Sequence, residues 1–333
     1  MEDKSSRLGW ILFTAIAPIA WGSSYVVTRQ MLPEDAPLWG GLLRALPAGL
    51  ILLAISRRLP TGSWWWRSLV LGALNVGGFF VLIYIAGQRL PSGLAATLMS
   101  TSALVMMLFA WGMLRQKPRM VAVLGALVGL VGVAVMLGFG GGPVDVWGVV
   151  VSLGAMVASS FGYILTSRWG SDIPAVTMSS WQLIGGSVLL IPVAVLVEGA
   201  PPTLTPASAL GFLYVSVVAT ALAYVAWFTG LRRLPAGVVG VVGLLNPVTG
   251  VLLGVALAGE AFGLSQGIGL ALVLGGVALG SLPSMSGIRR SRVRKTAVRG
   301  IRPSNLPDMS RVPEVPAVTR PITAQLALAV PRR

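Results

Sequence analysis

The sequence predicts an all-α integral membrane protein with ten transmembrane helices, arranged as two inverted repeats of five. Its composition is the first reason. Hydrophobic residues make up 55% of the 333 residues and charged residues 11%, with a mean hydropathy of +0.83. A soluble domain carries about 25% charged residues, so this chain has too few of them to form a water-soluble surface. A series of long apolar runs is the second reason, and an internal repeat is the third.

Apolar runs of about twenty residues recur along the chain, and each is long enough to cross the ~30 Å hydrocarbon core of a bilayer. Pro37, Pro91, Pro174 and Pro235 mark helix starts, where the missing N–H removes no helical hydrogen bond. We expect spans at residues 8–28, 37–56, 67–88, 91–113, 119–139, 146–167, 174–197, 208–230, 235–257 and 264–283.

The internal repeat relates residues 88–136 to residues 232–280 by a shift of 144 positions without gaps. Each copy opens on nearly the same turn, Gln-Arg-Leu-Pro-Ser-Gly in the first and Arg-Arg-Leu-Pro-Ala-Gly in the second. We therefore divide the chain into a first repeat at 1–143, a second repeat at 144–284 and a tail at 285–333. Because five spans per repeat is an odd number, the second repeat must enter the membrane inverted.

Basic residues predict the orientation of the helices. One side of the membrane receives eleven of them before the tail, and the opposite side receives only Arg29 and Arg89. The eleven are Lys4, Arg7, Arg57, Arg58, Arg67, Arg115, Lys117, Arg119, Arg168, Arg232 and Arg233. Both termini are therefore expected in the cytoplasm, and the protein is expected in the plasma (cytoplasmic) membrane as a multi-pass protein.

The chain has no cysteine and no histidine. Thiolate or imidazole metal sites and histidine-based catalysis are therefore excluded. No phosphate-binding GxxxxGK[ST] motif occurs either, which argues against ATP as the energy source. We expect no enzyme activity, no metal and no cofactor.

The tail beyond Met285 holds eleven of the 25 basic residues. Its composition predicts disorder, and its charge allows attraction to anionic lipid headgroups. Nucleic-acid binding is not expected, since no aromatic residues are interleaved for base stacking. The partners we expect are the lipid bilayer and a small-molecule substrate, with the protein a monomer or a homodimer.

Several short motifs occur in a definite order along residues 8–283. They are Ala20-Trp21-Gly22-Ser23-Ser24-Tyr25, Pro37 with Arg44, the two Leu-Pro-Ser/Ala-Gly helix starts, Asn246-Pro247, Gly259-Glu260, and Gly-Val-Ala in the fifth and tenth spans. In this order they resemble the EamA-like branch of the drug/metabolite transporter superfamily. The family implies a ten-helix fold with a central cavity that moves small metabolites or drugs, often outward, without ATP.

The first repeat departs from the family pattern. In the 144-residue register, Asn246-Pro247 corresponds to Ser102-Ala103, and Glu260 corresponds to Gln116. The family often has proline and glutamate in both halves. The two halves are therefore expected to differ in flexibility, and a coupling scheme that needs two symmetric carboxylates is in doubt.

Polar and aromatic residues inside the spans are the candidate substrate-binding groups. Arg44 is the only charge well inside a span, which makes it a functional hypothesis by default, although it could instead snorkel to the interface. The other candidates could equally form interhelical hydrogen bonds. The full set is Trp21, Ser24, Tyr25, Arg44, Asn75, Tyr163, Gln182, Tyr224 and Asn246.

Pro247 and Glu260 are the candidate gating or coupling residues. Pro247 cannot donate to the carbonyl of Gly243, so the ninth span should kink or open there, unless the break serves only packing. Glu260 lies at a span end, where it could also be an interfacial cap.

The function we expect is secondary transport by alternating access around a central cavity, with export of amino acids or related metabolites as the first choice. One alternative is export of uncharged or cationic drug-like solutes. The other is a non-transporting receptor or scaffold that acts through its basic tail.

Overall fold

The computed structural model describes residues 4–100, 102–115, 120–138, 144–170, 172–234 and 236–280, and these ranges contain helices but no strand. The chain divides into one unit at Met1–Leu282 and a second at Pro283–Arg333. The predicted basic tail lies outside the described residues.

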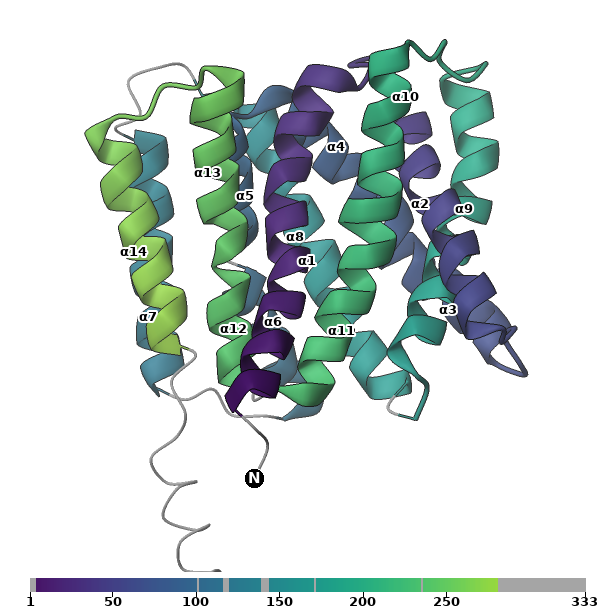
Figure 1. The fold of residues 1–333 in the computed structure, drawn as a ribbon, viewed down its shortest axis with the longest axis horizontal. Coiled ribbons are helices and arrows are strands. Elements are labelled where there is room, and N and C mark those ends of the chain that lie inside the picture. Colours follow the sequence, from purple (N-terminus) through teal and green to yellow (C-terminus); the bar gives the residue numbers. More distant parts are fainter. Residues whose placement is uncertain are drawn as a thin grey trace, which may run out of the picture. The chain divides into compact units, whose positions relative to one another are not determined.

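The helices follow one another through short connections (Figure 1). They are α1 (Lys4–Met31), α2 (Pro37–Ser56), α3 (Trp64–Gly72), η1 (Ala73–Gly78), α4 (Phe79–Arg89), α5 (Ser92–Ser100), α6 (Ser102–Leu114), α7 (Met120–Gly138), α8 (Val146–Trp169), α9 (Ala175–Val197), α10 (Pro206–Leu213), η2 (Tyr214–Leu222), α11 (Ala223–Arg233), α12 (Ala236–Gly243), α13 (Leu245–Ala258) and α14 (Leu264–Gly280).

Six of these stretches are long and apolar enough to cross a membrane. They are Leu8–Met31, Pro37–Ser56, Trp64–Arg89, Val146–Thr166, Ala175–Val197 and Pro206–Arg233, and each coincides with a predicted span to within a few residues. Three shorter apolar helices fall on further predicted spans, at Met120–Met136, Leu245–Ala258 and Leu264–Gly276. The total of ten spans, and the side on which the termini lie, stay predictions.

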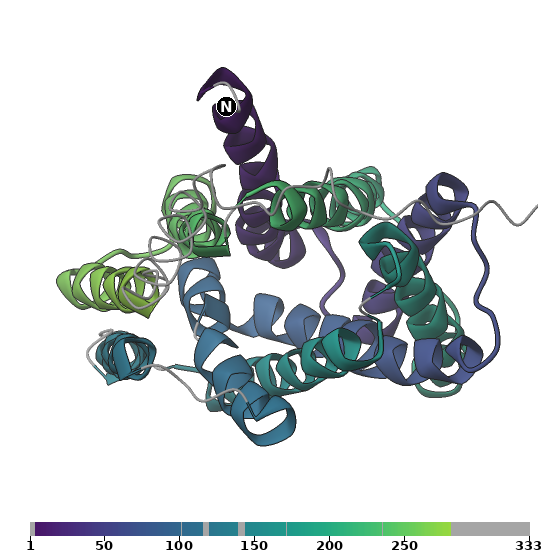
Figure 2. The ribbon, with the colours of Figure 1, turned by 90° about the horizontal axis from the view of Figure 1, so that it is seen from below.

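Neighbouring helices pair across the two predicted repeats. The helix α7 packs against α14, α2 against α9, and α1 against both α11 and α13. Figure 2 shows α7 and α14 together at one edge, while the other helices surround the middle of the bundle. Glycine allows the closest approaches: a Cβ added to Gly132 would lie 2.6 Å from the carbonyl oxygen of Gly269. Small residues at such contacts let helix backbones meet in lipid.

Two stretches inside long helices widen into π-helix. The first is η1, which joins α3 to α4, and the second is η2, which joins α10 to α11. A shift of 144 positions carries residues 73–78 onto 217–222, which lie within η2. Because π-turns inside helices are rare and occur often at functional sites, their matching positions direct attention to the side chains they carry.

The ninth predicted span is broken where proline chemistry requires it. The helix α12 ends at Gly243 and α13 begins at Leu245. Pro247 has no N–H to donate to the Gly243 carbonyl, and its ring crowds that carbonyl. The expected interruption of this span is therefore present.

Carboxylates cap helix N-termini at one end of the bundle, which we call the capped face. Glu198 accepts from the backbone N–H groups of Leu38 and Trp39, at 2.7 and 3.0 Å. Glu260 accepts from those of Ser92 and Gly93, at 2.7 and 3.4 Å. Each carboxylate follows a helix of the second predicted repeat and stabilises the positive end of a helix dipole in the first.

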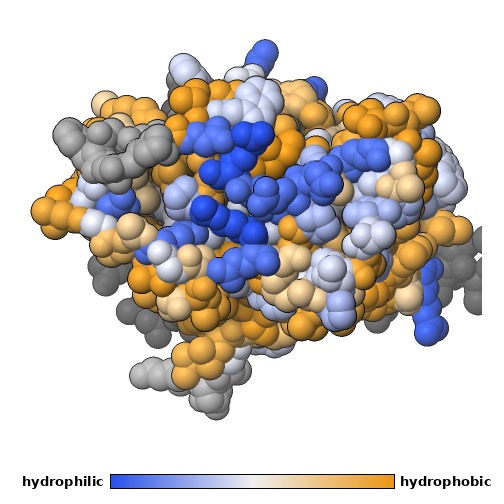
Figure 3. Space-filling model, turned by 90° about the horizontal axis from the view of Figure 1, so that it is seen from above, coloured by the Kyte–Doolittle hydropathy of each residue, from blue (hydrophilic) through white to orange (hydrophobic). Residues whose placement is uncertain are grey.

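Asp145 caps a third helix at the same face. It accepts from the Gly148 N–H of its own helix α8 at 3.0 Å and pairs with Arg89 at 2.9 Å. These two contacts, the backbone one first, lower the pKa of the Asp145 carboxyl below its ordinary value, so the group is ionised at neutral pH. Figure 3 shows hydrophilic side chains gathered across the middle of this face, with apolar ones around them.

A Gly186→Val substitution should destabilise the bundle. A Cβ there would lie 2.7 Å from the carbonyl oxygen of Gly72 and 2.8 Å from the Cβ of Val76, so α9 would have to move away from α3 and η1. Overpacking of this kind costs about 1–3 kcal/mol. Thermal unfolding of the purified protein in detergent measures the loss.

Gly112→Val is the matched control, because nothing lies within 4 Å of a Cβ added at Gly112. Equal melting temperatures for the two variants would contradict the close packing of α9 on α3 and η1.

Candidate functional site

Arg44 projects from α2 into the bundle, where the protein supplies its partners. Its Nε donates to Thr220 Oγ1 at 3.0 Å, and its Nη2 donates to the Ala219 carbonyl at 3.4 Å. The guanidinium also lies over the Phe80 ring, 4.5 Å from the centroid. A cation over an aromatic face gains electrostatic attraction that grows when water is excluded. The side chain is thus held inside the bundle by its neighbours.

The π-helix η2 is what presents Thr220 and Ala219 to Arg44. The Thr220 hydroxyl donates to the carbonyl of Val215, five residues earlier, at 2.8 Å. That bond fixes the hydroxyl, which then accepts from Arg44. The wide turn therefore holds the Thr220 hydroxyl in the position where it accepts from Arg44.

Two tyrosines lie near the guanidinium, and a third lies near one of them. Tyr25 of α1 and Tyr224 of α11 interact electrostatically with Arg44, and Tyr163 of α8 interacts with Tyr224. Within the described residues, none of the three hydroxyls makes a hydrogen bond to another group. Tyr163 is 38% exposed although it lies inside the long helix α8. The hydroxyls are therefore free to donate to a solute or accept from it.

Aromatic rings continue the site along α1 and α11. Trp21 meets Tyr224 edge to face with centroids 6.4 Å apart, and it meets Trp227 at 5.2 Å. Tyr224 in turn meets Phe228 at 5.9 Å. Such pairs contribute about 0.5–1.5 kcal/mol beyond their buried area. They form a rigid apolar wall beside the charged group.

The two predicted amides meet each other. Asn75 Nδ2 donates to Gln182 Oε1 at 2.7 Å and to Thr166 Oγ1 at 3.3 Å, which joins η1, α9 and α8. Asn75 Oδ1 is buried without a partner among the described residues and lies against Gly162, the residue before Tyr163. The amide pair therefore adjoins Tyr163 on α8.

The remaining predicted binding residues have different surroundings. The Ser24 hydroxyl donates to the carbonyl of Trp21 in its own helix at 2.7 Å. The backbone of Asn246 lies against Gly22 of α1, and its side-chain Oδ1 is buried without a partner in the described part of the chain. Pro247 is buried in α13, next to the break. Glu260 lies at the capped face, where its carboxylate pairs with Arg29 at 3.5 Å.

No carboxylate neutralises Arg44 within the described ranges. The ion pairs of Arg29 with Glu260 and of Arg89 with Asp145 both lie at the capped face. The same ranges contain no group of carboxylates that could hold a metal ion. The site thus presents a positive charge, free hydroxyls and aromatic rings, which suits a solute that carries an anionic group and an apolar part.

Sequence reasoning missed Phe80 and the two π-helices. Phe80 lies in an apolar run whose pattern does not distinguish a side chain under a guanidinium from one that faces lipid. The π-helix η2 had a weak signal, because hydroxyl residues such as Thr220 can donate to the backbone of their own helix, here to the carbonyl of Val215.

Helices of membrane-spanning length, with polar and aromatic side chains between them, define a multi-pass membrane protein. The chain belongs to the EamA-like transporter family, whose family model matches residues 8–138 and again residues 146–282. It is therefore a membrane transporter of small compounds, located in the cytoplasmic membrane.

Two bacterial relatives are similar over most of this chain. Protein PecM of Dickeya dadantii is 36% identical over 244 residues, which cover 73% of this chain and 82% of PecM. The uncharacterized inner membrane transporter YedA of Escherichia coli is 29% identical over 79% of this chain and 88% of YedA. One crystal structure superposes with a TM-score of 0.59 over 82% of this chain and 98% of its own, at 20% identity, and so shows the fold alone.

Thr220→Val should destabilise the protein because it leaves the charged Nε of Arg44 without its acceptor. An unsatisfied buried partner of this kind costs about 1–3 kcal/mol. Thermal unfolding in detergent measures the change.

Thr229→Val is the matched control on the same long helix, since the Thr229 hydroxyl only donates to the carbonyl of Val225 in its own helix, at 2.6 Å. If the two variants melt together, Thr220 does not anchor the guanidinium.

Proposed function

We propose that the protein is a secondary transporter that exports amino acids or related carboxylates, by alternating access around the site built on Arg44. The observation that carries this proposal is the guanidinium itself. It lies among helices, with a hydroxyl, a carbonyl and an aromatic ring as partners and no carboxylate in the described residues. A solute that brings a carboxylate would complete it.

Energetics favour a substrate in this role. An arginine at the centre of a transmembrane helix costs about 2.5–3.5 kcal/mol on insertion scales. A planar carboxylate can accept two parallel hydrogen bonds from a guanidinium, which fixes the orientation of the solute as well as strengthening its binding. The apolar side chain of an amino acid would then face the Trp21 and Tyr224 rings, whose edge-to-face contact holds them in place.

The alternating-access part of the proposal rests on two inverted repeats, at residues 1–143 and 144–284. Three observations support it. The family model matches two successive stretches, the π-helices η1 and η2 occupy corresponding positions, and helices related by the repeat pack in pairs, such as α2 with α9. Inverted repeats place a substrate site between the halves near the membrane midplane.

Pro247 and Glu260 are the proposed moving parts. The break between Gly243 and Leu245 is the proposed hinge, about which α12 tilts while α13 stays in place. Glu260 follows α13 and bonds to the N-terminus of α5, which makes it a latch between the halves at the capped face. Release of that latch would let the capped face open.

Counterflow of a labelled amino-acid panel in proteoliposomes tests the proposal. We expect accumulation by the wild type, and a fall of about tenfold or more in Arg44→Ala, since tenfold corresponds to about 1.4 kcal/mol. Arg44→Lys should recover only part of the loss, because an ammonium cannot make the bidentate pair.

Arg168→Ala is the control, because this exposed arginine lies in the last turn of α8, at the membrane surface. Equal counterflow by the wild type and Arg44→Ala would remove Arg44 from the binding site.

The aromatic wall favours a second candidate, export of uncharged or cationic drug-like solutes. Trp21, Tyr224 and Trp227 could bind such a solute by stacking or by cation–π attraction without help from Arg44. The decarboxylated amine of each transported amino acid separates the two proposals. Transport of the amine at the rate of its parent, unaffected by Arg44→Ala, would establish this second candidate.

A further inference from the structure

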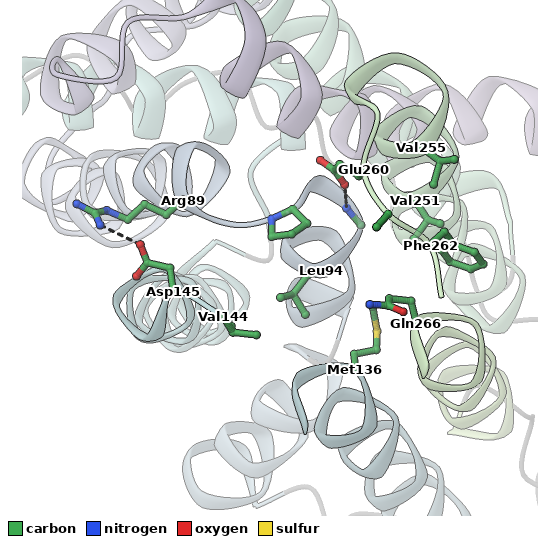
Figure 4. Close-up of a pocket in the computed structure, with 13 residues that line it drawn as sticks. Arg89, Leu94, Met136, Val144, Asp145, Val251, Val255, Glu260, Phe262 and Gln266 are labelled. Carbon is green, nitrogen blue, oxygen red and sulfur yellow. Dashed lines mark hydrogen bonds and ion pairs between the residues drawn. The ribbon is translucent and has the colours of Figure 1, made fainter. Parts of the chain in front are cut away.

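The carboxylates of the capped face already have partners in the protein. Glu260 accepts from the N-terminus of α5 and pairs with Arg29, and Asp145 pairs with Arg89. Figure 4 shows both carboxylates beside a cavity of about 190 Å³ whose wall is otherwise mostly apolar. The charged side chains of that cavity are all paired, so it has no free charge with which to select a ligand. A cation without such a partner lies at the opposite end of the bundle.

That cation is Arg67, in the first turn of α3. Its guanidinium lies 5.6 Å from the ring centroid of Trp169, which is the last residue of α8. Because α8 begins at the capped face, where Asp145 caps it, its last residue lies at the other end of the bundle. Arg67 is therefore at an end of the membrane-spanning helices, at the depth where lipid headgroups lie.

Three indole rings surround the Arg67 guanidinium. Its Cζ lies 5.4 Å from the ring centroid of Trp64 and 5.6 Å from those of Trp66 and Trp169. A cation within about 6 Å of a ring face is attracted by it. We call these four residues the Arg67 cluster.

The rings of the cluster are held in place by further contacts. Trp66 meets Trp169 edge to face at 5.4 Å, and Trp64 meets Trp181 of α9 at 5.8 Å. The indole N–H of Trp181 donates to the carbonyl of Arg58, just beyond α2, at 2.7 Å. Segments from α2, α3, α8 and α9 thus fix the surroundings of one guanidinium.

The protein supplies rings to Arg67 but no oxygen. Within the described ranges its side chain makes no hydrogen bond and no ion pair, and Asp172, the carboxylate that follows α8, does not pair with it. The Nε atom is buried without a partner, whereas neither terminal nitrogen is among the buried unpartnered atoms of the described chain, so both reach the surface. Two such N–H groups form the fork that matches a phosphate or a carboxylate.

An exposed apolar strip leads from the cluster along α3 toward the middle of the bundle. Trp66, Leu69 and Val70 are 51%, 38% and 37% exposed, and they share one face because they stand at i, i+3 and i+4. Ala73, one turn further on, is exposed as well. A charged group with an apolar strip beneath it matches a lipid, whose anionic head and acyl chains are joined in the same order. A free phosphate ion would gain nothing from the strip.

We propose that the Arg67 cluster is a binding site for one anionic phospholipid. The lipid phosphate accepts from the two terminal N–H groups of Arg67, and an acyl chain lies on Trp66, Leu69 and Val70. The exposed Arg57 and Arg58 add positive charge at this end, which favours a headgroup of net negative charge over a zwitterionic one. Such a lipid would bridge α3 and α8. The site is separate from Arg44 and does not depend on the proposed transport.

Native mass spectrometry of the full-length protein in detergent measures the dissociation constant of the first lipid bound. Dioleoylphosphatidylglycerol and dioleoylphosphatidylcholine carry the same chains and differ in net charge. We expect the wild type to bind the phosphatidylglycerol about tenfold more tightly, because each surface arginine attracts only a lipid of net negative charge. Equal affinities for the two lipids would overturn the anionic assignment.

Arg67→Gln should weaken phosphatidylglycerol binding about tenfold, because charge-assisted hydrogen bonds to the phosphate are lost. Arg232→Gln is the matched control: it removes the same charge from an exposed arginine in the last turn of α11, away from any ring. Its affinity should equal that of the wild type. Equal weakening by the two substitutions would show a diffuse attraction to basic residues and would overturn the site.

Ser63→Glu keeps the test decisive if Arg67→Gln fails to fold. Ser63 is exposed just before α3, and its carbonyl accepts from the Arg67 backbone N–H at 3.2 Å, so the two residues are one turn apart. A glutamate there suits the N-terminus of the helix and offers a carboxylate to the guanidinium four residues on. This variant should melt no lower than the wild type and bind phosphatidylglycerol about tenfold more weakly. Wild-type affinity in folded Ser63→Glu would overturn the proposal.

Glycerol 3-phosphate separates the lipid from a free phosphate. At the same concentration as the phosphatidylglycerol it should leave the bound lipid in place, because it has no acyl chain to lie on the strip. Displacement of the lipid under these conditions would overturn the lipid assignment.

Discussion

A guanidinium inside a membrane has no water to bond to, so the protein must supply hydrogen-bond acceptors and other partners in its place. The interior of this bundle is arranged around that requirement. Arg44 obtains a hydroxyl from Thr220, a carbonyl from Ala219 and a ring face from Phe80. Each partner comes from a helix other than its own. The π-helix η2, the packing of α2 against η2 and α4, and the free tyrosine hydroxyls all accompany one charge placed where lipid would otherwise exclude it.

The capped face shows how the same chain handles charge near water. Glu198 and Glu260 each end a helix of the second repeat and accept from a helix N-terminus of the first. In the 144-residue register their counterparts are Ala54 and Gln116, which carry no negative charge. One end of the bundle is therefore tied by carboxylates, and the corresponding positions of the other repeat have none.

The positions of most helices could be predicted from the sequence, because hydrophobic length and proline position act locally. Nine of the predicted spans coincide with apolar helices, and the break before Pro247 is present; both came from such rules, whereas a role for Arg44 in binding stays a prediction. The hydrogen bond between Asn75 and Gln182 was not predicted. The sequence shows that a buried amide needs a partner, but it does not show which residue that partner is. Phe80 and the cavity beside Asp145 depend on how distant segments converge, and no local pattern records that.

The π-helices have a consequence for how this chain should be aligned with its relatives. Successive residues of an α-helix are about 100° apart around the axis, so losing one residue turns everything beyond it by that amount. Between Tyr214 and Leu222 such a deletion is absorbed instead, because each i→i+5 turn holds one residue more than an α-turn and can close to α-helix. A relative with a one-residue gap at this place would keep Tyr224 and Trp227 facing the interior but lose the wide turn that presents Thr220 and Ala219 to Arg44.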